Sequence, residues 1–480
     1  MKYIQTIFYI FLLNSILFAQ APDTLWTRTF GGSSTEWGYS VQQTTDGGYI
    51  ITGFTSSFGA GAGDIWLVKT DASGDTLWTR TFGGSSAEWG YSVQQTTDNG
   101  YIITGSTISF GTGSSDLWLI KTNINGDILW TKTYGGISGD VGRYVQQTTD
   151  GGYIIAGNTQ MGWYASNVWL LKTNSYGDTL WTKIFGVLGY NEGYSVQQTT
   201  DGGYILIVRQ SIGINNFWLI KTDANGDSLW TRTYGGINSD KGESVRQTAD
   251  GGYIITGSTS SYGAGERDIW LIKTDSNGDM IWNRTYGGSN YEEGGHSVQQ
   301  TTDGGYILIG ATTSFGEVEG DIWMIKTDSD GDTLWTKTFG GSDRDEGLAV
   351  QQTTDGGYIF IGMTRSFGAG SNDIWLIKTA PDITGIGRSE VQPVSFTLHQ
   401  NYPNPFNPAT TIEFTIAQSG FVKLKVHNIL GQEVATLLEA HKPAGQYVVN
   451  FDASQLTSGI YYYTLTVGDF TQTRKMVLLR

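Results

Sequence analysis

The chain has 480 residues, of which 68 are glycine, 17 are tryptophan, 7 are proline and none is cysteine. It carries 29 Lys and Arg against 45 Asp and Glu, a formal net charge of −16, and 13% of its residues are aromatic. The lack of cysteine excludes a disulfide scaffold and a thiol nucleophile, the aromatic content argues against disorder, and the acidic balance excludes a basic nucleic-acid-binding surface. The length exceeds the roughly 250–300 residues at which a single core stops growing, which favours several domains or repeats.

The N-terminus has the pattern of a secretory signal peptide. Lys2 gives a short positive region, Ile4–Phe18 an apolar run, and Ala19 a small residue at the cleavage position. The run is too short for a confident membrane span, which needs about 20 apolar residues. We expect residues 1–19 to be a signal peptide, with an uncleaved anchor helix as the alternative.

Residues 20–379 contain a repeat of about 52 residues, present seven times. Tryptophans recur at intervals of 49 to 53 residues in one series, and a second series of seven lies between them. The first series is Trp26, Trp78, Trp130, Trp181, Trp230, Trp282 and Trp335; the second is Trp66, Trp118, Trp169, Trp218, Trp270, Trp323 and Trp375. Such a period is typical of solenoids and propellers.

Each repeat predicts four short strands. In the first copy they are Tyr39–Thr44, Tyr49–Thr55, Asp64–Thr70 and Asp75–Phe82, joined in pairs by hairpin turns such as Asp46-Gly47-Gly48. Four-stranded units in tandem predict the blades of a β-propeller. Because Asp23–Phe30 resembles a lone fourth strand and the last copy ends after its third strand at Thr379, we predict an all-β, seven-bladed propeller closed by the N-terminal strand.

The two variable connections of each repeat are expected to emerge on one face, which is the candidate functional face. Aromatic side chains that belong to neither tryptophan series fall there, and they can stack on sugar rings or anchor a partner protein. The alternative is packing between neighbouring blades. The candidate ligand-binding residues are Trp37, Trp89, Trp163, Tyr164, Tyr190, Tyr291 and Arg209, the last at a departure from the repeat pattern.

An acidic residue follows each tryptophan of the first series by ten or eleven residues. Sevenfold repetition predicts an acidic ring that attracts cations or binds Ca²⁺; alternatively, each carboxylate caps the backbone amides of its own Gly-rich loop. The ring comprises Glu36, Glu88, Asp140, Glu192, Asp240, Glu292 and Asp345.

The sequence predicts no catalytic residues, no cofactor and no metal. The Asp-x-x-Gly-Asp turns lack the remaining ligands of a calcium-binding EF-hand loop, and the four histidines do not repeat. We expect no Ser-His-Asp or zinc constellation. Paired carboxylates across blades, as in glycoside hydrolases, stay open as an alternative.

The composition changes at Ala380, and five of the seven prolines lie between Pro381 and Pro408. Residues 380–395 therefore predict a linker. Residues 396–480 predict short antiparallel strands, near Thr411–Ile416, Val422–Asn428, Glu433–Leu438, Gln446–Phe451, Ile460–Val467 and Thr471–Leu479, that form a small Ig-like β-sandwich.

The C-terminal region resembles a known family. Leu398–Phe414 (LHQNYPNPFNPATTIEF), Val422–Gly431 (VKLKVHNILG), Ser458–Tyr462 (SGIYY) and Lys475–Leu479 (KMVLL) are similar to the type A sorting domain of the type IX secretion system. The resemblance implies export to the surface or exterior of a Gram-negative bacterium, with the secretion machinery as a partner. The sorting-signal residues it implies are Pro443, Gly445, Tyr447, Gly459, Tyr461 and Lys475.

These observations favour a secreted or cell-surface protein that is not an enzyme. We expect a monomeric propeller that binds a glycan or a protein, or serves structurally, and binds no nucleic acid. The alternative is a secreted polysaccharide hydrolase or lyase that uses acids on the variable-loop face.

Overall fold

The computed structural model describes residues 20–160, 165–186, 189–212, 214–316, 319–382, 396–401, 403–416, 420–442, 445–468 and 470–479. The chain divides into two compact units, Met1–Gly385 and Ile386–Arg480. Every regular element in the described ranges is a β-strand, and no helix there is long and apolar enough to cross a membrane. The predicted signal peptide, residues 1–19, lies outside the described residues.

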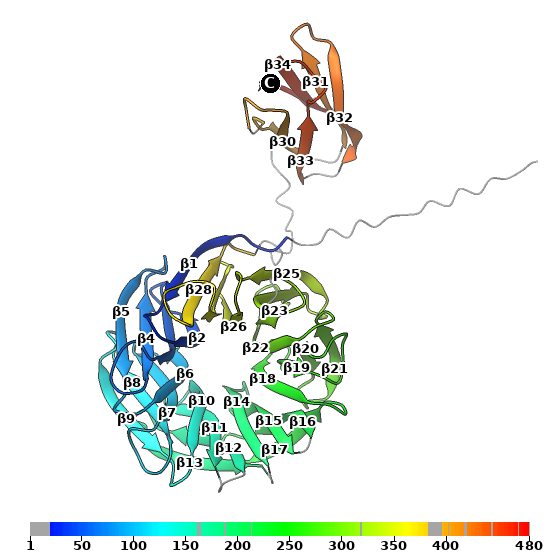
Figure 1. Ribbon diagram of the computed structural model, residues 1–480. Helices are drawn as coiled ribbons and strands as arrows, with labels where there is room; N and C mark the ends of the chain where they lie inside the picture. The colour runs from blue at the N-terminus through cyan, green and yellow to red at the C-terminus, as the bar shows by residue number, and fades with distance from the viewer. Residues whose placement is uncertain are drawn as a thin grey trace, which may run out of the picture. The chain divides into compact units, whose positions relative to one another are not determined.

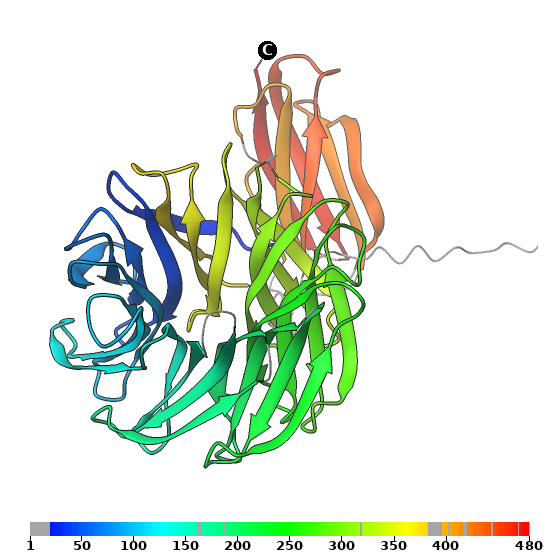
Figure 2. The same ribbon diagram turned by 60° about the horizontal axis from the view of Figure 1, so that its bottom comes forward.

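In the first unit, antiparallel sheets stand side by side around a central opening (Figures 1 and 2). The strands nearest the opening are β2 (Glu36–Gln43), β6 (Glu88–Gln95), β10 (Asp140–Gln147), β14 (Tyr190–Gln198), β18 (Asp240–Gln247), β22 (Glu292–Gln300) and β26 (Asp345–Gln352). Each pairs with a second strand: β3 (Tyr49–Thr55), β7 (Tyr101–Thr107), β11 (Tyr153–Gln160), β15 (Tyr204–Ile212), β19 (Tyr253–Thr259), β23 (Tyr306–Thr312) and β27 (Tyr358–Thr364).

The third and fourth strands continue each sheet outward. The third strands are β4 (Asp64–Thr70), β8 (Asp116–Thr122), β12 (Ser166–Thr173), β16 (Ile214–Thr222), β20 (Asp268–Thr274), β24 (Asp321–Thr327) and β28 (Asp373–Thr379). The outer strands are β5 (Thr76–Phe82), β9 (Ile128–Tyr134), β13 (Thr179–Phe185), β17 (Ser228–Tyr234), β21 (Met280–Tyr286), β25 (Thr333–Phe339) and β1 (Thr24–Phe30).

Two pairings complete this arrangement. β1 pairs with β28, with Arg28 opposite Leu376, so the first strand of the chain is the outer strand of the sheet formed by β26, β27 and β28. A parallel bridge between Ser166 and Tyr190 joins β10–β13 to β14–β17 as one eight-stranded sheet. The two ends of the repeat array therefore meet by strand pairing, and β28 has a partner strand on each side.

The core lies between the sheets. Second and third strands are buried on both faces, whereas outer strands such as β5 alternate exposed and partly buried residues. The outer-strand tryptophans pack edge-on against the tyrosine that begins the second strand of the next sheet; Trp26 and Tyr49 have ring centroids 5.7 Å apart. The repeated Trp and Tyr thus hold adjacent sheets together.

A buried lysine fixes the Asp-Gly-Gly turn of each repeat, which in one copy is Asp98-Asn99-Gly100. The Lys69 side chain is 3% exposed, and its Nζ lies 2.9 Å from Asp46 Oδ2 and donates to the Thr70 carbonyl. Asp46 also accepts from Thr44 Oγ1 and from the Gly48 amide, while Gly47 has φ +83°, which favours glycine. The same ion pair recurs as Lys121–Asp98, Lys172–Asp150, Lys221–Asp201, Lys273–Asp250, Lys326–Asp303 and Lys378–Asp355.

Glutamine side chains link neighbouring sheets in a complete circle near the hairpin turns. In each link the Oε1 of the last glutamine of an inner strand accepts from a turn amide of the preceding sheet, and the circle closes from Thr354 N to Gln43. The other links run from Thr45 to Gln95, Thr97 to Gln147, Thr149 to Gln198, Thr200 to Gln247, Ala249 to Gln300 and Thr302 to Gln352.

The second unit consists of two sheets, ordered β29-β30-β33 and β32-β31-β34-β35. Its strands are β29 (Thr397–Leu398), β30 (Ala409–Ile416), β31 (Gly420–Asn428), β32 (Glu433–Lys442), β33 (Gly445–Asp452), β34 (Gly459–Val467) and β35 (Phe470–Leu478). Leu398, Phe414, Val426, Tyr463 and Met476 form part of its apolar core. The alternation of buried and exposed residues in β34 matches a sheet with one covered face.

Candidate functional site

Each inner strand carries a β-bulge a few residues after it begins. In β2, Gly38 pairs with Gly53 and Ser40 with Thr52, so Tyr39 is an extra residue without a partner. A bulge turns its extra side chain away from the regular alternation of the strand. The bulge residues are Tyr39, Tyr91, Arg143, Tyr194, Glu243, His296 and Leu348; in β22 the bulge includes Gly295 as well.

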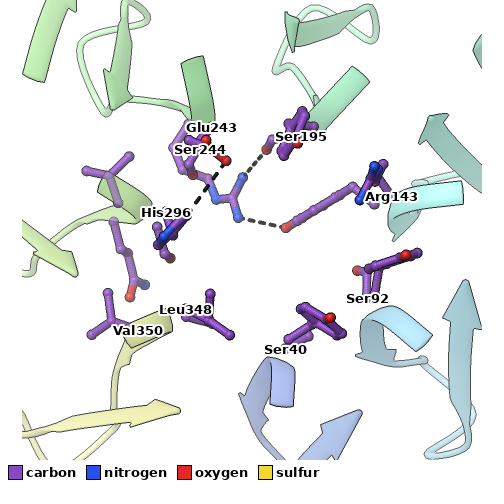
Figure 3. Close-up of a pocket in the computed structure, with 18 of the residues that line it drawn as sticks. Ser40, Ser92, Arg143, Ser195, Glu243, Ser244, His296, Leu348 and Val350 are labelled. Carbon is purple, nitrogen blue, oxygen red and sulfur yellow. Dashed lines mark hydrogen bonds and ion pairs between the residues drawn. The ribbon is translucent and has the colours of Figure 1, made fainter. Parts of the chain in front are cut away.

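All of these bulge side chains line a central cavity of about 830 Å³ (Figure 3). The size falls within the roughly 300–1,000 Å³ of small-molecule sites. The bulge position carries five different residue types, although the flanking residues repeat closely. The inner strands therefore place unlike side chains around one cavity on an otherwise repeated scaffold.

Polar neutral groups line the hairpin end of the cavity. Glutamine side chains there accept hydrogen bonds from the inner strand of the next sheet. For example, the Gln95 amide donates to Gln42 Oε1 at 2.6 Å. Arg246 takes the place of this glutamine in β18 and donates instead to Ser195 Oγ at 2.9 Å and to Tyr144 OH at 2.7 Å. These contacts reach across to β14 and β10 (Figure 3).

His296 lies between two carboxylates. Its Nδ1 is 3.7 Å from Glu243 Oε2 and its Nε2 is 3.1 Å from Glu346 Oε1, and the side chain is only 18% exposed. Burial alone would lower the pKa of His296, but Glu243 and Glu346 raise it to about 10. His296 is therefore a cation at neutral pH. Glu346 also pairs with Arg344 at 3.0 Å.

Cations gather at the variable-loop end of the cavity. Arg209 (β15), Lys241 (β18) and Arg267, which directly precedes β20, all line it. Arg209 donates to Tyr194 OH at 3.1 Å, and the Arg267 guanidinium lies 4.8 Å from the Tyr291 ring centroid. Burial and the nearby charges of Arg209 and Arg267 lower the pKa of Lys241. These three side chains thus form one cluster of like charge.

The predicted aromatic candidates lie elsewhere. Trp37 and Trp89 stand in strands β2 and β6, not in loops, because pairing with β3 and β7 begins before the bulge. Trp37 stacks on Tyr39, with ring centroids 6.2 Å apart, and Trp89 stacks on Phe54 of the neighbouring sheet at 5.7 Å. Neither is part of the cavity lining.

The remaining aromatic candidates are Tyr190, Tyr291, Trp163 and Tyr164. Tyr190 begins β14 and is 48% exposed, and the Tyr291 ring contacts the Arg267 guanidinium. Trp163 and Tyr164 lie outside the described residues. Of the predicted ligand-binding residues within the described ranges, Arg209 is the one that lines the cavity.

Six of the seven predicted acids are buried and cap their own loops. Glu36 accepts from the Gly32 amide at 2.9 Å, from Thr55 Oγ1 at 2.9 Å and from the Ser57 amide at 3.1 Å. Glu88, Asp140, Asp240, Glu292 and Asp345 likewise accept from the amide four residues earlier. Within the described ranges, no group of three or more His, Asp or Glu side chains is placed to hold a metal ion.

The prediction for Glu192 needs correction. Gly193 pairs with Val208 as Gly38 pairs with Gly53, so Asn191 occupies the position of Glu36, and Glu192 that of Trp37. Glu192 is partly exposed, and its Oε1 lies 3.4 Å from Arg143 Nη2. The spacing from Trp181 to Glu192 is eleven residues rather than ten, and this shift moves Glu192 by one position.

A second set of buried acids, which the repeat also shows, meets the first. Asp64 begins β4. Its carboxylate and that of Glu88 both lie close to Gly83: a Cβ atom added at Gly83 would be 1.5 Å from Asp64 Oδ1 and 2.6 Å from Glu88 Oε2. Two carboxylates thus converge on one glycine between adjacent sheets. Burial, together with Glu88, raises the pKa of Asp64. Between β12 and β14 the corresponding residues are Asn167 and Asn191.

Sequence reasoning missed the bulge residues as a group. Each lies two residues before the valine of the repeated Val-x-Gln phrase, for example Tyr39 before Val41 and His296 before Val298. Aligning the repeats on that valine would have shown a variable column between repeated ones. The first strand was instead predicted to begin at this residue, as in Tyr39–Thr44, so the pairing that precedes the bulge was missed.

Five of the six predicted sorting-signal residues lie in strands of the second unit. Gly445 and Tyr447 are in β33, where Tyr447 stacks on Phe414 at 5.4 Å, and Gly459 begins β34. Tyr461 is buried and donates to the Thr457 carbonyl at 2.8 Å. Lys475, in β35, is exposed. Pro443 lies outside the described residues.

Comparison with known families confirms the resemblance of this unit. Residues 400–479 match the secretion system C-terminal sorting domain. The chain is therefore exported by the type IX secretion system to the cell surface or the extracellular space. No curated protein matches the chain.

The solved structures that the chain resembles have little sequence in common with it. PorZ, a bacterial surface component of the type IX secretion system of Porphyromonas gingivalis, is 11% identical with a TM-score of 0.46, over 94% of this chain and 60% of PorZ. YCF48 bound to D1 peptide is 11% identical with a TM-score of 0.43, over 77% of this chain and all of that one. Puromycin hydrolase is 14% identical with a TM-score of 0.39, over 72% and 52%. The chain thus spans about 60% of the length of PorZ.

Proposed function

Because its C-terminal unit carries a type IX sorting domain, we propose that the chain is an exported, non-enzymatic binding protein. In this proposal residues 1–19 are a signal peptide, residues 20–379 a seven-bladed β-propeller, residues 380–395 a linker, and residues 396–480 an Ig-like β-sandwich that the secretion machinery recognises. The pairing of β1 with β28 and the closed circle of glutamine links support the seven-bladed architecture.

The binding site that we propose is the central cavity. The observation that carries this assignment is the set of seven bulge side chains that line it. Positions that repeat serve the scaffold, whereas an unlike set around one cavity suits a specific ligand. The ligand class that follows from this lining is a glycan or a segment of a protein.

The hydrogen bonds and ion pairs of the acidic side chains support binding without catalysis. A hydrolase needs carboxylates that reach the substrate, one of them as a proton donor. Six of the predicted acidic residues instead accept hydrogen bonds from backbone amides of their own loops. Of the two carboxylates that line the cavity, Glu243 is paired with His296 and Glu293 with Arg344.

A glycan array probed with the full chain, together with a Leu348→Trp variant, tests the proposal. Leu348 is a bulge residue of the cavity wall, and an indole there would occupy the space that a ligand needs. We expect binding by the wild-type chain and loss of binding in the variant. Leu77→Trp, at an exposed outer-strand position, is the matched control.

Two results would contradict the proposal. Reducing ends released from a bound polysaccharide would indicate a hydrolase or lyase. Binding that survives in Leu348→Trp would place the ligand outside the cavity.

A further inference from the structure

The charge of the cavity is opposite to that of the chain. Its lining includes five basic side chains against two carboxylates, Glu243 and Glu293, a formal excess of three positive charges, whereas the chain carries −16. The basic residues are Arg143, Arg209, Lys241, Arg246 and Arg267. Protonated His296 is paired with Glu243 and Glu346 and is not counted in this excess. A concave site lined by one sign of charge concentrates ligands of the opposite sign.

The cations at the variable-loop end lack carboxylate partners. Among the described residues, Arg209, Lys241 and Arg267 form no ion pair within 4.0 Å, and the Lys241 ammonium has no hydrogen bond. The Nε of Arg267 is buried without a hydrogen-bond partner. Partly buried cations without a carboxylate in ion-pair contact are costly, and their mutual repulsion adds to the cost.

The scaffold does not require these charges. The equivalents of Arg209 are Phe54, Ser106, Asn158, Ser258, Ala311 and Met363, and those of Lys241 are Trp37, Trp89, Val141, Glu192, Glu293 and Glu346. The equivalents of Arg267, each directly before the acid or amide that begins the third strand, are Gly63, Ser115, Ser166, Asn215, Gly320 and Asn372. None of these residues is basic. The cluster is therefore specific to β15, β18 and the start of β20.

The neutral part of the lining suits hydroxyl groups. Ser40, Ser92, Ser244 and Ser297 line the cavity together with the glutamines of the inner strands. Hydroxyl and amide side chains both donate and accept, as the hydroxyls of a sugar do. The rings of Tyr39 and Tyr91, whose centroids are 5.1 Å apart, add aromatic surface to the wall formed by β2 and β6.

Resting on the proposed function, we propose that the cavity binds an acidic saccharide, whose carboxylate or sulfate is held by Arg209, Lys241 and Arg267 while the serines and glutamines bind its hydroxyls. An anionic group among the three cations would form charge-assisted hydrogen bonds and relieve their repulsion. An acidic peptide offers the same charge but few hydroxyl groups for this lining.

Titration calorimetry of the full chain tests this proposal with four probes of similar size. They are a trigalacturonate, a sulfated galactose trisaccharide, a neutral galactose trisaccharide and a hexaglutamate peptide. We expect the acidic saccharides to bind at least about tenfold more tightly than the neutral one, and the affinity to fall as salt is raised. The two acidic sugars distinguish a carboxylate from a sulfate ligand.

Charge variants localise the effect. Lys241→Gln and Lys241→Glu should each weaken binding of the acidic saccharide by about tenfold or more. Both should fold, because other repeats carry glutamate at this position, and melting curves check this. Lys183→Gln, which removes an outer-strand lysine paired with Asp227, makes the same change in net charge and should leave the affinity unchanged.

The inference is overturned if the neutral and acidic saccharides bind equally, if the Lys241 variants bind like wild type, or if hexaglutamate binds more tightly than either acidic sugar. A neutral glycan that binds wild type but not Leu348→Trp, with no preference for acidic sugars, would overturn this inference alone. Absence of any glycan or peptide binding would overturn the proposed function with it.

Discussion

The repeated positions and the bulge positions of the first unit contrast sharply. Turn ion pairs such as Lys69–Asp46 recur in every sheet with almost the same geometry. A few residues away, the bulge column changes from Tyr39 to Arg143 to Glu243 to Leu348. The contrast separates what builds the ring from what lines its cavity. We therefore expect changes at repeated positions to act on stability and changes at the cavity wall to act on binding.

Removal of the closing strand should have the largest effect. Deleting residues 20–30 removes β1 and leaves β28 paired on one side only, with β27, and it exposes Tyr49, against which Trp26 packs. We expect the melting temperature to fall by about 10 °C or more. Differential scanning calorimetry measures this. An unchanged melting temperature would show that strand pairing does not close the ring.

Loss of one turn lysine should have the next largest effect. Lys172→Met leaves the Asp150 carboxylate without its cation and should lower the free energy of unfolding by about 1–3 kcal/mol. Burial would raise the pKa of Asp150, but Lys172, Thr148 and the Gly152 amide lower it to about 2. The stabilisation is therefore present above the ordinary value of 3.8 and is lost as pH falls through about 2.

The matched control for this variant is Lys132→Met. Lys132 pairs with Asp178 on an outer strand, and its side chain is 42% exposed, so its loss should change stability by less than about 0.5 kcal/mol. Urea unfolding of both variants at pH 7 gives the comparison. Equal losses would contradict a special role for the turn lysine.

His296→Gln should have a smaller, pH-dependent effect. The neutral side chain leaves Glu243 and Glu346 without their shared cation, and we expect a loss of about 1–2 kcal/mol at pH 7. Because the folded pKa of about 10 exceeds the ordinary value of 6.5, the contribution is complete below pH 6.5 and disappears as pH rises through about 10. Unfolding curves between pH 6 and 10 should show the two proteins converging; a constant difference would contradict the ion-pair assignment.

Asp64→Asn should have the smallest effect and the opposite sign. The pKa of Asp64 is raised by burial and by Glu88, so its contribution to stability decreases as pH rises from the unfolded value through the folded one. The amide should increase stability at pH 7 by under about 1 kcal/mol and reduce this pH dependence. The chain itself carries Asn167 and Asn191 at one such junction. A clear loss of stability at pH 7 would mean that the carboxylate pair is needed.

The strands were predictable because the same pattern of strand and turn residues occurs in all seven repeats. The expected Tyr49–Thr55 and Asp64–Thr70 coincide with β3 and β4. The first strand begins at Glu36 rather than Tyr39. A bulge breaks the period-two alternation, and Gly38 beside it lacks a side chain that would mark a strand. Trp37 was for this reason assigned to a loop.

The cavity was harder to predict because its wall comes from seven distant segments. Arg209, Lys241 and Arg267 become neighbours only when β15 packs against the adjacent sheet, which contains β18 and β20. Arg209 was singled out because it interrupts the repeat, whereas Lys241 and Arg267 stand in segments that were aligned as scaffold or loop. Whether the predicted acidic residues face a ligand or cap their own loops depends on hydrogen bonds to loop amides, which the spacing of the residues does not determine.

The central claim is that the ligand lies in the cavity, held by residues that do not repeat. A crystal structure of the full chain with an acidic trisaccharide tests this most directly. We expect the sugar between the inner strands, with its acidic group within hydrogen-bond distance of Lys241 and Arg209. A sugar bound instead on the outer strands or over the variable loops, with the cavity empty, would contradict the account.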